Sequence, residues 1–250
     1  MRTVVATRYV TALREGGSLP GLVEADDDGL YVVKFRGAGQ GPRALAAELI
    51  AGEIARALGL NVPELVLVEL DPRIAVAEPD PEIQDLLRAS AGLNVGLDFL
   101  PGSLPYNPLD PVAAELAAEV VWFDALVLNV DRTPRNPNLL HWHDALWLID
   151  HGASFFRHHR AGEPGWDASA AAREPFPAIS EHVLIDAAAP LRSVDERLAA
   201  LLGPSVLERI VGLVPDAWAD PAPYLDFLAA RLRAPRPFVE EADRGRDAAG

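Results

Sequence analysis

Three polar side chains near the middle of the chain have the types and spacing that phosphoryl transfer needs. Asp131 and Asn136 lie five positions apart in the polar segment NVDRTPRNPNLL, and Asp150 follows at the end of a later apolar run. One carboxylate could accept the proton of an attacking hydroxyl, while a second carboxylate and a carboxamide could hold Mg²⁺ through oxygen atoms. Taken alone, the same pattern also fits turn residues and a capping group.

A second pair of charged residues lies earlier in the chain. Lys34 follows two valines at the end of an expected strand, and Glu48 lies on the next expected helix. Burying an unpaired ammonium is costly, so a lysine in apolar surroundings needs a partner. A Lys34–Glu48 pair could hold the ammonium toward an anionic phosphate. Taken alone, the pattern is more typical of a solvated edge-strand lysine and a helix-surface glutamate.

The N-terminal third should supply the elements that position Lys34 and Glu48. Val- and Thr-rich runs predict strands, the Asp-Asp-Asp-Gly turn predicts a hairpin, and an Ala-, Leu- and Glu-rich run without breakers predicts a helix. The expected elements are a strand over 3–13, a hairpin over 22–34, a helix over 43–58 and a strand over 62–70.

The remainder of the chain should carry the polar segment and Asp150. Residues 71–110 are proline-rich and predict a connecting segment with one short helix around 81–90. Asp110 and Pro111 resemble the cap and first turn of a long helix. The expected elements after it are a helix to residue 129, a hairpin over 139–150 turning at His143-Asp144, and Pro-punctuated helices.

The order of these parts matches the protein-kinase-like fold: a glycine-bearing hairpin, a strand lysine, a helix glutamate, a D-x-x-x-x-N loop and a D-x-G after a hairpin. Segments AELIAGEIARALGLNVPE, VWFDALVLNVDRTPRNPNLL and LWLIDHGASF resemble the helix, catalytic and metal-binding segments of HipA-like kinases. The catalytic loop is also similar to that of phosphoinositide kinases. The resemblance covers roughly residues 10–160, and it is specific only when the motifs are taken together.

The resemblance implies a nucleotide site in the N-terminal part. Lys34 would contact the phosphates of ATP, and Glu48 would pair with it. Gly16, Gly17 and Ser18 would cover the phosphates through backbone N–H groups, because glycine permits close approach.

The resemblance also implies the catalytic and metal roles. Asp131 would be the catalytic base, while Asn136 and Asp150 would hold Mg²⁺, with Asn138 replacing Asn136 if the loop register differs. In addition, Arg132 or Arg135 would steady either a phosphate or the Asp131 loop.

Several positions depart from the related families. Thr133 stands where related loops often carry histidine, and residues 150–152 read Asp-His-Gly where ordinary protein kinases have Asp-Phe-Gly. The glycine loop is short and differs from G-x-G-x-x-G, and the N-terminal extension of HipA toxins is missing. These departures leave the candidate catalytic residues in place but put protein-kinase activity and a toxin role in doubt.

The implied fold is α+β and two-lobed, with a small β-rich N-lobe and a mainly helical C-lobe. The adenine would lie between the lobes, near the segment GLNVGLDFLPG. The expected organisation is one HipA-like kinase domain over 1–235, with the N-lobe at about 1–70, the connecting segment at about 71–110, the C-lobe at about 111–235 and a disordered tail at 236–250.

Composition limits the partners. The net charge of −15, without a basic run, argues against nucleic acid, and no run of 18 apolar residues predicts a membrane span. The chain has no cysteine, which excludes thiolate chemistry and fits a cytoplasmic location. The N-terminus lacks signal-peptide features, and the Ala- and Arg-rich composition is typical of a GC-rich bacterial genome.

Two other functions remain open. The chain could be a kinase-like module that binds nucleotide or a partner with little or no catalysis. Alternatively, a histidine cluster could bind zinc and activate water in a metallohydrolase. Its spacing disfavours this, because no pair has the i, i+4 spacing of metal-binding helices. The histidines concerned are His141, His143, His151, His158 and His159.

The sequence does not define the acceptor, which could be a protein Ser or Thr, a small molecule or a lipid head group.

Overall fold

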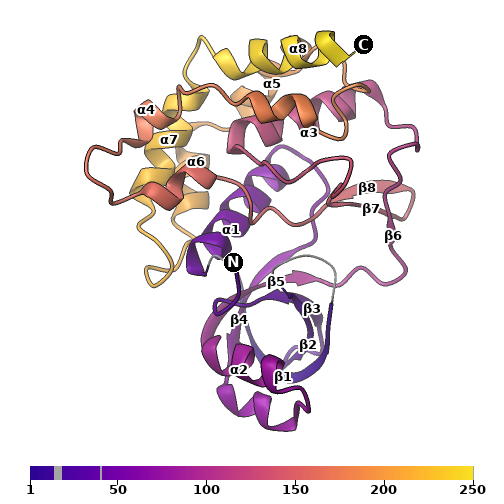
Figure 1. The fold of residues 1–250 in the computed structure, drawn as a ribbon, viewed down its shortest axis with the longest axis vertical. Coiled ribbons are helices and arrows are strands. Elements are labelled where there is room, and N and C mark those ends of the chain that lie inside the picture. Colours follow the sequence, from indigo (N-terminus) through magenta and orange to yellow (C-terminus); the bar gives the residue numbers. More distant parts are fainter. Residues whose placement is uncertain (14–18, 40, 250) are drawn as a thin grey trace.

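The computed structural model of this 250-residue chain describes residues 1–13, 19–39 and 41–249. They form a small β-barrel and a larger, mainly helical body above it (Figure 1). The two-lobed α+β architecture predicted from the sequence is therefore confirmed. Over the described ranges, every helix is too short or too polar to serve as a membrane span.

The small body is a closed barrel with the strand order β1-β2-β3-β5-β4. Neighbouring strands are antiparallel, except that β1 and β4 pair in parallel and close the barrel. Alternate side chains, including Val23, Val33 and Val68, are buried in its interior, as the two-residue period of a strand requires. The strands are β1 (Thr3–Ala12), β2 (Gly21–Ala25), β3 (Leu30–Lys34), β4 (Leu65–Leu70) and β5 (Gly92–Asp98).

The strand β5 is a finding that the sequence pattern does not predict. Its residues, GLNVGLD, include two glycines and an aspartate, which are unfavourable in strands. Gly96 is needed there because a Cβ atom would lie 2.6 Å from Cγ2 of Val68 on β4. The proline-rich segment around β5 also contains η1 (Pro72–Ala77) and the predicted short helix α2 (Pro81–Ala89), so much of it packs on the barrel.

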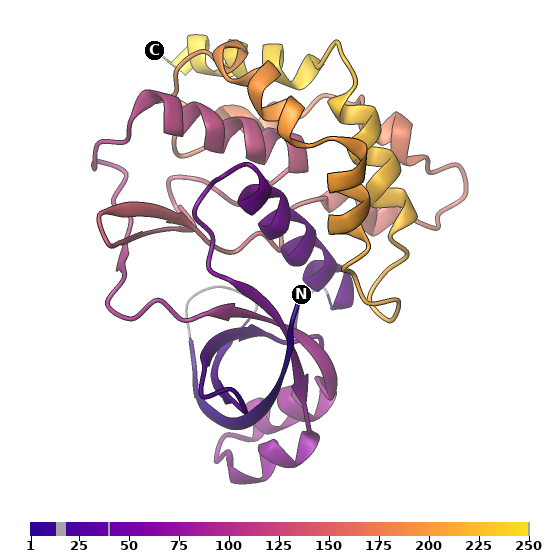
Figure 2. The ribbon, with the colours of Figure 1, turned by 180° about the vertical axis from the view of Figure 1, so that it is seen from behind.

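Helix α1 (Pro42–Ala57) carries Glu48 and links the two bodies. It leaves the barrel after β3, packs into the core of the helical body, and returns the chain to β4 (Figure 2). Small residues allow this close packing: a Cβ atom on Gly52 would lie 3.0 Å from a methyl group of Leu65. The barrel interior and the helical body have separate hydrophobic cores, and α1 belongs to the second.

Helix α3 (Ala114–Val127) is the central helix of the larger body, and residues 120–127 are buried. The predicted helix start at Asp110-Pro111 is wrong. Asp110 closes a local turn instead, because its backbone N–H donates to the carbonyl of Asn107 at 2.8 Å and its carboxylate accepts from the Asn107 N–H. The helix begins only at Ala114.

A small sheet with the order β6-β7-β8 lies at one edge of the helical body. The predicted hairpin is confirmed: β7 and β8 pair antiparallel, and His143 and Asp144 form the turn with positive φ values of 48° and 58°. Its elements are β6 (Leu104–Pro105), β7 (Leu139–Trp142) and β8 (Ala145–Leu148). Further along the chain lie η2 (Phe156–Arg160), α4 (Ala168–Ala171), η3 (Pro177–Glu181), η4 (Leu191–Ser193), α5 (Asp195–Leu201), α6 (Pro204–Val211), α7 (Ala222–Leu232) and α8 (Pro237–Ala249).

The prediction of a disordered tail over 236–250 is wrong. Residues Pro237–Ala249 form α8, which covers the top of the helical body in Figure 1. Phe238, Val239 and Ala242 are buried, and the Phe238 ring packs edge-on against Trp122 of α3. Exposed charged residues such as Glu240 and Asp247 alternate with the buried ones along this helix, so composition alone was misleading.

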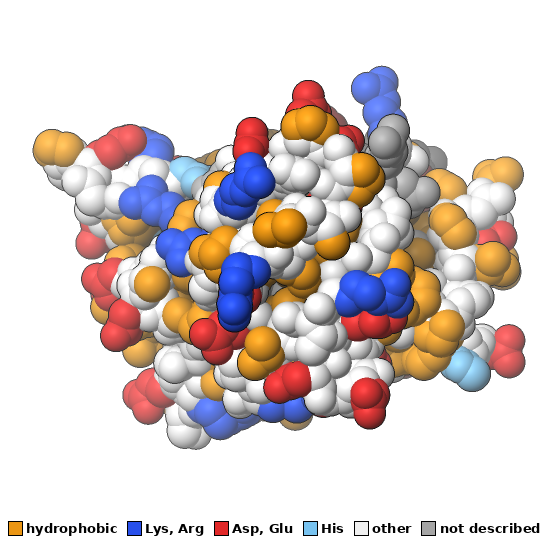
Figure 3. Space-filling view, turned by 90° about the horizontal axis from the view of Figure 1, so that it is seen from below, with side chains coloured by type: hydrophobic (Ala, Val, Ile, Leu, Met, Phe, Trp, Pro, Cys, Tyr) orange, Lys and Arg blue, Asp and Glu red, His pale blue; other side chains and the backbone are white. Residues whose placement is uncertain are grey.

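The lower face of the molecule, formed by the barrel end, carries mixed charges. In Figure 3 the blue Lys and Arg side chains lie singly among red Asp and Glu side chains, with hydrophobic side chains between them. This face therefore offers no continuous basic strip among its described residues, in keeping with the acidic composition.

Candidate active site

Lys34, Glu48 and Asp150 meet where the barrel contacts the helical body. Lys34 lies at the end of β3, and its Nζ donates to Oε2 of Glu48 on α1 and to Oδ1 of Asp150 at 2.5 Å. Glu48 is fully buried, and Lys34 is 8% exposed. The Asp150 side chain is 33% exposed, so one member of the cluster faces solvent. The predicted Lys34–Glu48 pair therefore forms.

The electrostatics of this cluster keep its groups charged. Burial disfavours an ammonium, but the carboxylates of Glu48 and Asp150 raise the pKa of Lys34 above its ordinary value. Burial likewise disfavours the Glu48 carboxylate, but the charge of Lys34 and the bond from His151 lower the pKa of Glu48 to about 2. Each charge is thus stable only because the other is present.

Lys34 is also the only lysine in the chain, which has 22 Lys and Arg residues in all. All the other Lys and Arg positions are arginine, and only the buried position 34 is lysine, which has a compact ammonium on a flexible chain. The two side chains are not interchangeable, because the ammonium is a point charge with freely rotating donors. This composition signal singles out Lys34 without any structural information.

His151, the residue after Asp150, contacts Glu48 inside the core. Its Nδ1 lies 3.4 Å from Oε1 of Glu48, and its ring packs edge-on against Phe123 of α3. The side chain is completely buried. The histidine of the Asp-His-Gly sequence is therefore a buried partner of Glu48, which the rest of the sequence pattern did not indicate.

Asp131, Asn136 and Asn138 converge in the loop between α3 and β7. Oδ2 of Asp131 accepts hydrogen bonds from Nδ2 of Asn136 at 2.8 Å and from Nδ2 of Asn138 at 3.3 Å. Each amide donates one N–H to the same carboxylate oxygen, and neither amide oxygen accepts a bond from a described residue, so both oxygens are left for another partner. The two candidate metal ligands, Asn136 and Asn138, therefore both contact the carboxylate of Asp131.

Backbone and side-chain bonds tie this loop to the Asp150 segment. The N–H of Ile149 donates to the carbonyl of Asn138 at 3.1 Å, and the guanidinium of Arg132 contacts the carbonyls of both residues. Asp150, next to Ile149, has a left-handed backbone with φ of 55°. The Asp131 loop and the Asp150–Lys34 cluster therefore lie on adjoining segments.

A buried aspartate on α3 anchors the loop, and the sequence analysis missed it. Asp124 is fully buried and accepts from Nδ2 of Asn129 at 2.8 Å, from Nε of Arg132 at 2.5 Å and from Nε2 of His182 at 2.8 Å. Burial opposes its ionisation, but Arg132 and His182 hold the pKa of Asp124 well below its usual range. The available signal was an aspartate inside the apolar run VVWFDALVL.

The two arginines of the loop have different environments. Arg132 is 1% exposed and bound to Asp124, so it steadies the loop. Arg135 is exposed, and no carboxylate among the described residues lies within 4.0 Å of it. Of the two alternatives in the sequence interpretation, the contacts of Arg132 favour loop support.

The histidines do not form one cluster. His141 lies 3.3 Å from Asp110, His151 faces Glu48, and His158 stacks on Tyr224 with ring centroids 4.3 Å apart. Among the described residues, no three His, Asp or Glu side chains are grouped so that they could hold a metal ion. The metallohydrolase alternative therefore has no ligand set in this part of the chain.

His158 makes a prediction about stability. Burial lowers the pKa of this imidazole to about 4, with nearby His159 and Arg43 contributing. The unfolded chain binds a proton near the ordinary histidine value of about 6.5. Stability should therefore be full above pH 6.5 and decline as the pH falls toward 4.

Urea unfolding at several pH values would measure this effect. The His158→Phe variant should show a flatter decline between pH 6.5 and 4, while His143→Phe, at an exposed turn, should retain the wild-type slope. Equal slopes in all three proteins would rule out His158 as a source.

The glycine-bearing segment cannot be compared with its prediction. Gly16, Gly17 and Ser18 lie outside the described residues. Their proposed contact with phosphates rests on the sequence alone.

A protein-family model matches most of the chain. A family model described as HipA-like kinase matches residues 7–225. The chain belongs to the HipA-like kinase family. The match extends from β1 into α7, so both bodies of this HipA-like kinase are included. No curated protein sequence matches the chain significantly.

Solved structures share the fold at low sequence identity. The proinflammatory kinase CtkA of Helicobacter pylori is 11% identical, with a TM-score of 0.56 and 97% of each chain covered. The Golgi casein kinase with Mn and ADP bound is 12% identical, with a TM-score of 0.57, covering 99% of this chain and 75% of that one. Another structure of the Golgi casein kinase is 13% identical at the same TM-score, covering 100% and 76%. At identities this low, these matches show that the fold is kinase-like and no more. Together with the family match, they support a phosphotransferase.

Proposed function

We propose that this HipA-like kinase transfers the γ-phosphate of ATP, with Mg²⁺, to a hydroxyl acceptor. The observation that carries the proposal is the buried Lys34 ammonium, held between Glu48 and the partly exposed Asp150. A buried lysine with two carboxylate partners at the junction of two lobes is a group poised for an anionic ligand. In the proposal, Lys34 contacts the nucleotide phosphates and Glu48 keeps the ammonium charged and oriented.

Asp131 is the proposed base. Its carboxylate would orient the acceptor hydroxyl and take its proton while the hydroxyl oxygen attacks the γ-phosphorus; the bond from that phosphorus to the β–γ bridging oxygen breaks, and ADP leaves. The amides of Asn136 and Asn138 hold one oxygen of Asp131, and the other oxygen makes no side-chain bond to a described residue. That second oxygen would serve as the proton acceptor.

The donor set fits a magnesium ion. Asp150 offers a partly exposed carboxylate, and Asn136 or Asn138 offers an amide oxygen, which are the hard oxygen ligands that Mg²⁺ prefers. When bound, the ion would neutralise phosphate charge. The Golgi casein kinase structure with Mn and ADP bound, which shares the fold, supports nucleotide and divalent-metal use here.

A protein Ser or Thr is one acceptor class for the proposed reaction, and small hydroxyl compounds are another. The acidic chain and the mixed charges of its lower face argue against nucleic acids and anionic membranes as partners. A cytoplasmic location fits the absence of cysteine from the sequence. A catalytically weak nucleotide- or partner-binding module is the second candidate, favoured by the short, atypical glycine segment.

The single lysine allows a sharp test of nucleotide binding. An acyl-phosphate derivative of ATP should acylate Lys34, and mass spectrometry can assign the product, because the N-terminus is the only other primary amine in the chain. Excess ATP with Mg²⁺ should protect Lys34 but leave labelling of the N-terminus unchanged. Equal labelling with and without ATP would contradict the proposed nucleotide site.

Catalysis is tested separately with γ-labelled ATP. Transfer to the protein itself, to a Ser/Thr peptide mixture or slowly to water should require Mg²⁺ and disappear in the Lys34→Met variant, since the phosphates lose their cation. Lys34 protection without any transfer would favour the binding module over the kinase.

A further inference from the structure

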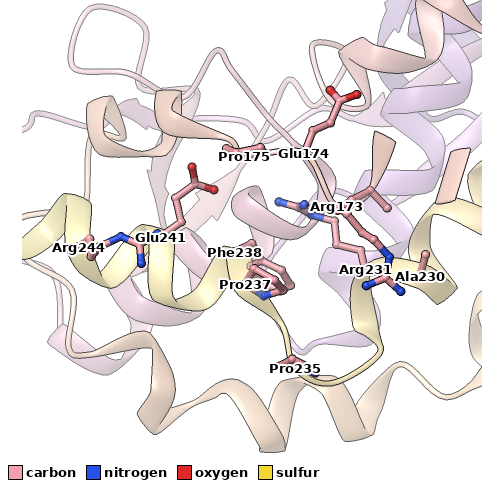
Figure 4. Close-up of a pocket in the computed structure, with 11 residues that line it drawn as sticks. Arg173, Glu174, Pro175, Ala230, Arg231, Pro235, Pro237, Phe238, Glu241 and Arg244 are labelled. Carbon is pink, nitrogen blue, oxygen red and sulfur yellow. Dashed lines mark hydrogen bonds between the residues drawn. The ribbon is translucent and has the colours of Figure 1, made fainter. Parts of the chain in front are cut away.

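A pocket remote from the candidate active site has a charge arrangement that the proposed function does not use. It lies between α7, α8 and residues 172–175, encloses about 90 Å³ and is lined by Arg173, Arg231 and Arg244 (Figure 4). We call it the arginine pocket. In the view of Figure 4, Arg173 and Arg231 lie on one side of Phe238, and Glu241 and Arg244 lie on the other.

Arg231 is the buried centre of the arginine pocket. It is 4% exposed, and its guanidinium donates to the Ala125 carbonyl at 2.6 and 3.1 Å and to the Ala172 carbonyl at 2.8 Å. These bonds use three of the five N–H groups of an arginine, so two remain for an acceptor. Its Cζ atom also lies 4.8 Å from the centre of the Phe238 ring. Carbonyls and rings solvate the cation without neutralising it.

The two carboxylates of the pocket bind groups other than the three arginines. Oε2 of Glu241 accepts from the backbone N–H of Phe176 at 2.7 Å, and Glu174 pairs with Arg157 at 3.3 Å. Among the described residues, no carboxylate lies within 4.0 Å of the guanidinium groups of Arg173, Arg231 or Arg244. The pocket is lined by three arginines and two glutamates, a formal charge of +1 in a chain whose net charge is −15, and none of the three guanidinium groups forms a close ion pair with a described residue.

Burying an unpaired guanidinium is unfavourable, and here burial also lowers the pKa of Arg231 to about 9. An anion that supplied the missing counter-charge would relieve this cost. A planar guanidinium binds two phosphate oxygens at once, and Arg173 and Arg231, which lie on the same side of Phe238 in Figure 4, could together hold a doubly charged phosphate. The volume of the pocket suits a single anionic group, because pockets for drug-sized ligands are about 300 Å³ or more.

We propose that the arginine pocket binds one phosphate group, carried either by a phosphorylated serine or by free inorganic phosphate. The site is separate from the proposed nucleotide site. Arg231 of α7 contacts the Ala125 carbonyl of α3, whereas Lys34 lies at the end of a barrel strand, and no candidate active-site residue lines the pocket. The two sites can therefore be tested independently.

Isothermal titration with inorganic phosphate and with N-acetyl-phosphoserine amide tests the proposal at constant ionic strength. The Arg173→Gln/Arg244→Gln variant should bind at least about tenfold more weakly than wild type, since the charge-assisted contact of Arg173 and the nearby positive charge of Arg244 are both lost. Arg209→Gln, which removes an exposed arginine of α6 without a close carboxylate, is the matched control and should bind like wild type. Lys34→Met should also retain binding. Phosphate held only at the nucleotide site would instead be lost in that variant.

The outcomes separate the sources. Tighter binding of the phosphoserine amide than of phosphate indicates a protein-borne phosphate, and the reverse indicates the free ion. Equal affinity for acetate and phosphate, no binding of either phosphate compound, or unchanged binding in the double arginine variant would overturn the proposal. Arg231→Lys, which keeps the buried charge but loses the planar fork, provides a second variant should the double variant fold poorly.

Discussion

Replacing Asp131 with asparagine is expected to lower the rate of phosphate transfer by about 10²- to 10⁴-fold, the usual contribution of a general base. A carboxamide cannot take the proton of the acceptor hydroxyl, so the chemical step loses its proton acceptor. The loop should keep its shape, because the amide oxygen of Asn at position 131 can still accept the bonds from Asn136 and Asn138. Nucleotide binding should therefore be unchanged.

Single-turnover assays with labelled ATP and a separate nucleotide titration would measure the two effects. Asp144→Asn is the matched control. It changes an exposed aspartate at the turn of the β7–β8 hairpin, where asparagine tolerates the left-handed backbone, and should leave both quantities unaltered. Transfer at the wild-type rate in Asp131→Asn would remove Asp131 from the role of base, and a parallel loss of nucleotide binding would point to a structural role instead.

Local patterning predicted the elements that present the candidate site. The apolar residues of β3, the breaker-free run of α1 and the hairpin turn at His143-Asp144 each have a strong local signal, and all three elements form as expected. The contact between Lys34 and Glu48 also forms, although the charge pattern taken alone favoured a solvated lysine and only the family resemblance implied the pair. Pairing across 14 residues could be argued because the carboxylate lies on the next element of the chain.

The long-range parts of the site had no comparable signal. His182 reaches Asp124 across 58 residues, and nothing in the local sequence around His182 marks it as a partner. Likewise β5 is a strand because it fills the gap between β3 and β4, although its glycines disfavour that conformation. Tertiary contacts decide both cases, and a pattern of local propensity does not contain them.

The choice between Asn136 and Asn138 as metal ligand also depended on geometry. Spacing from Asp131 favoured Asn136 by analogy with the resembling family. The structure brings both amides to the same oxygen of Asp131, so both remain proposed ligands. Loop register, which sequence spacing does not define, is the missing quantity.

Asp124→Asn is expected to lower the free energy of unfolding by about 3–5 kcal/mol, because it leaves the buried Arg132 guanidinium without a counter-charge. Every neighbour of the carboxylate is a donor. The imidazole of His182 accepts from the Leu184 N–H through Nδ1, so its Nε2 carries the proton that it donates to Asp124. An asparagine amide would turn one N–H group toward these donors.

Urea unfolding of Asp124→Asn, Arg132→Met and the double variant tests whether the cost comes from the charge pair. Removing both charges should cost less than the sum of the single changes, since neither partner is then left buried alone. Asp186→Asn, at an exposed position, should stay within about 0.5 kcal/mol of wild type. Strict additivity in the double variant would contradict the pairing. Coupling would instead show that the loop carrying Asp131 is held in place by an ion pair inside the core, so that catalytic geometry and fold stability depend on the same aspartate.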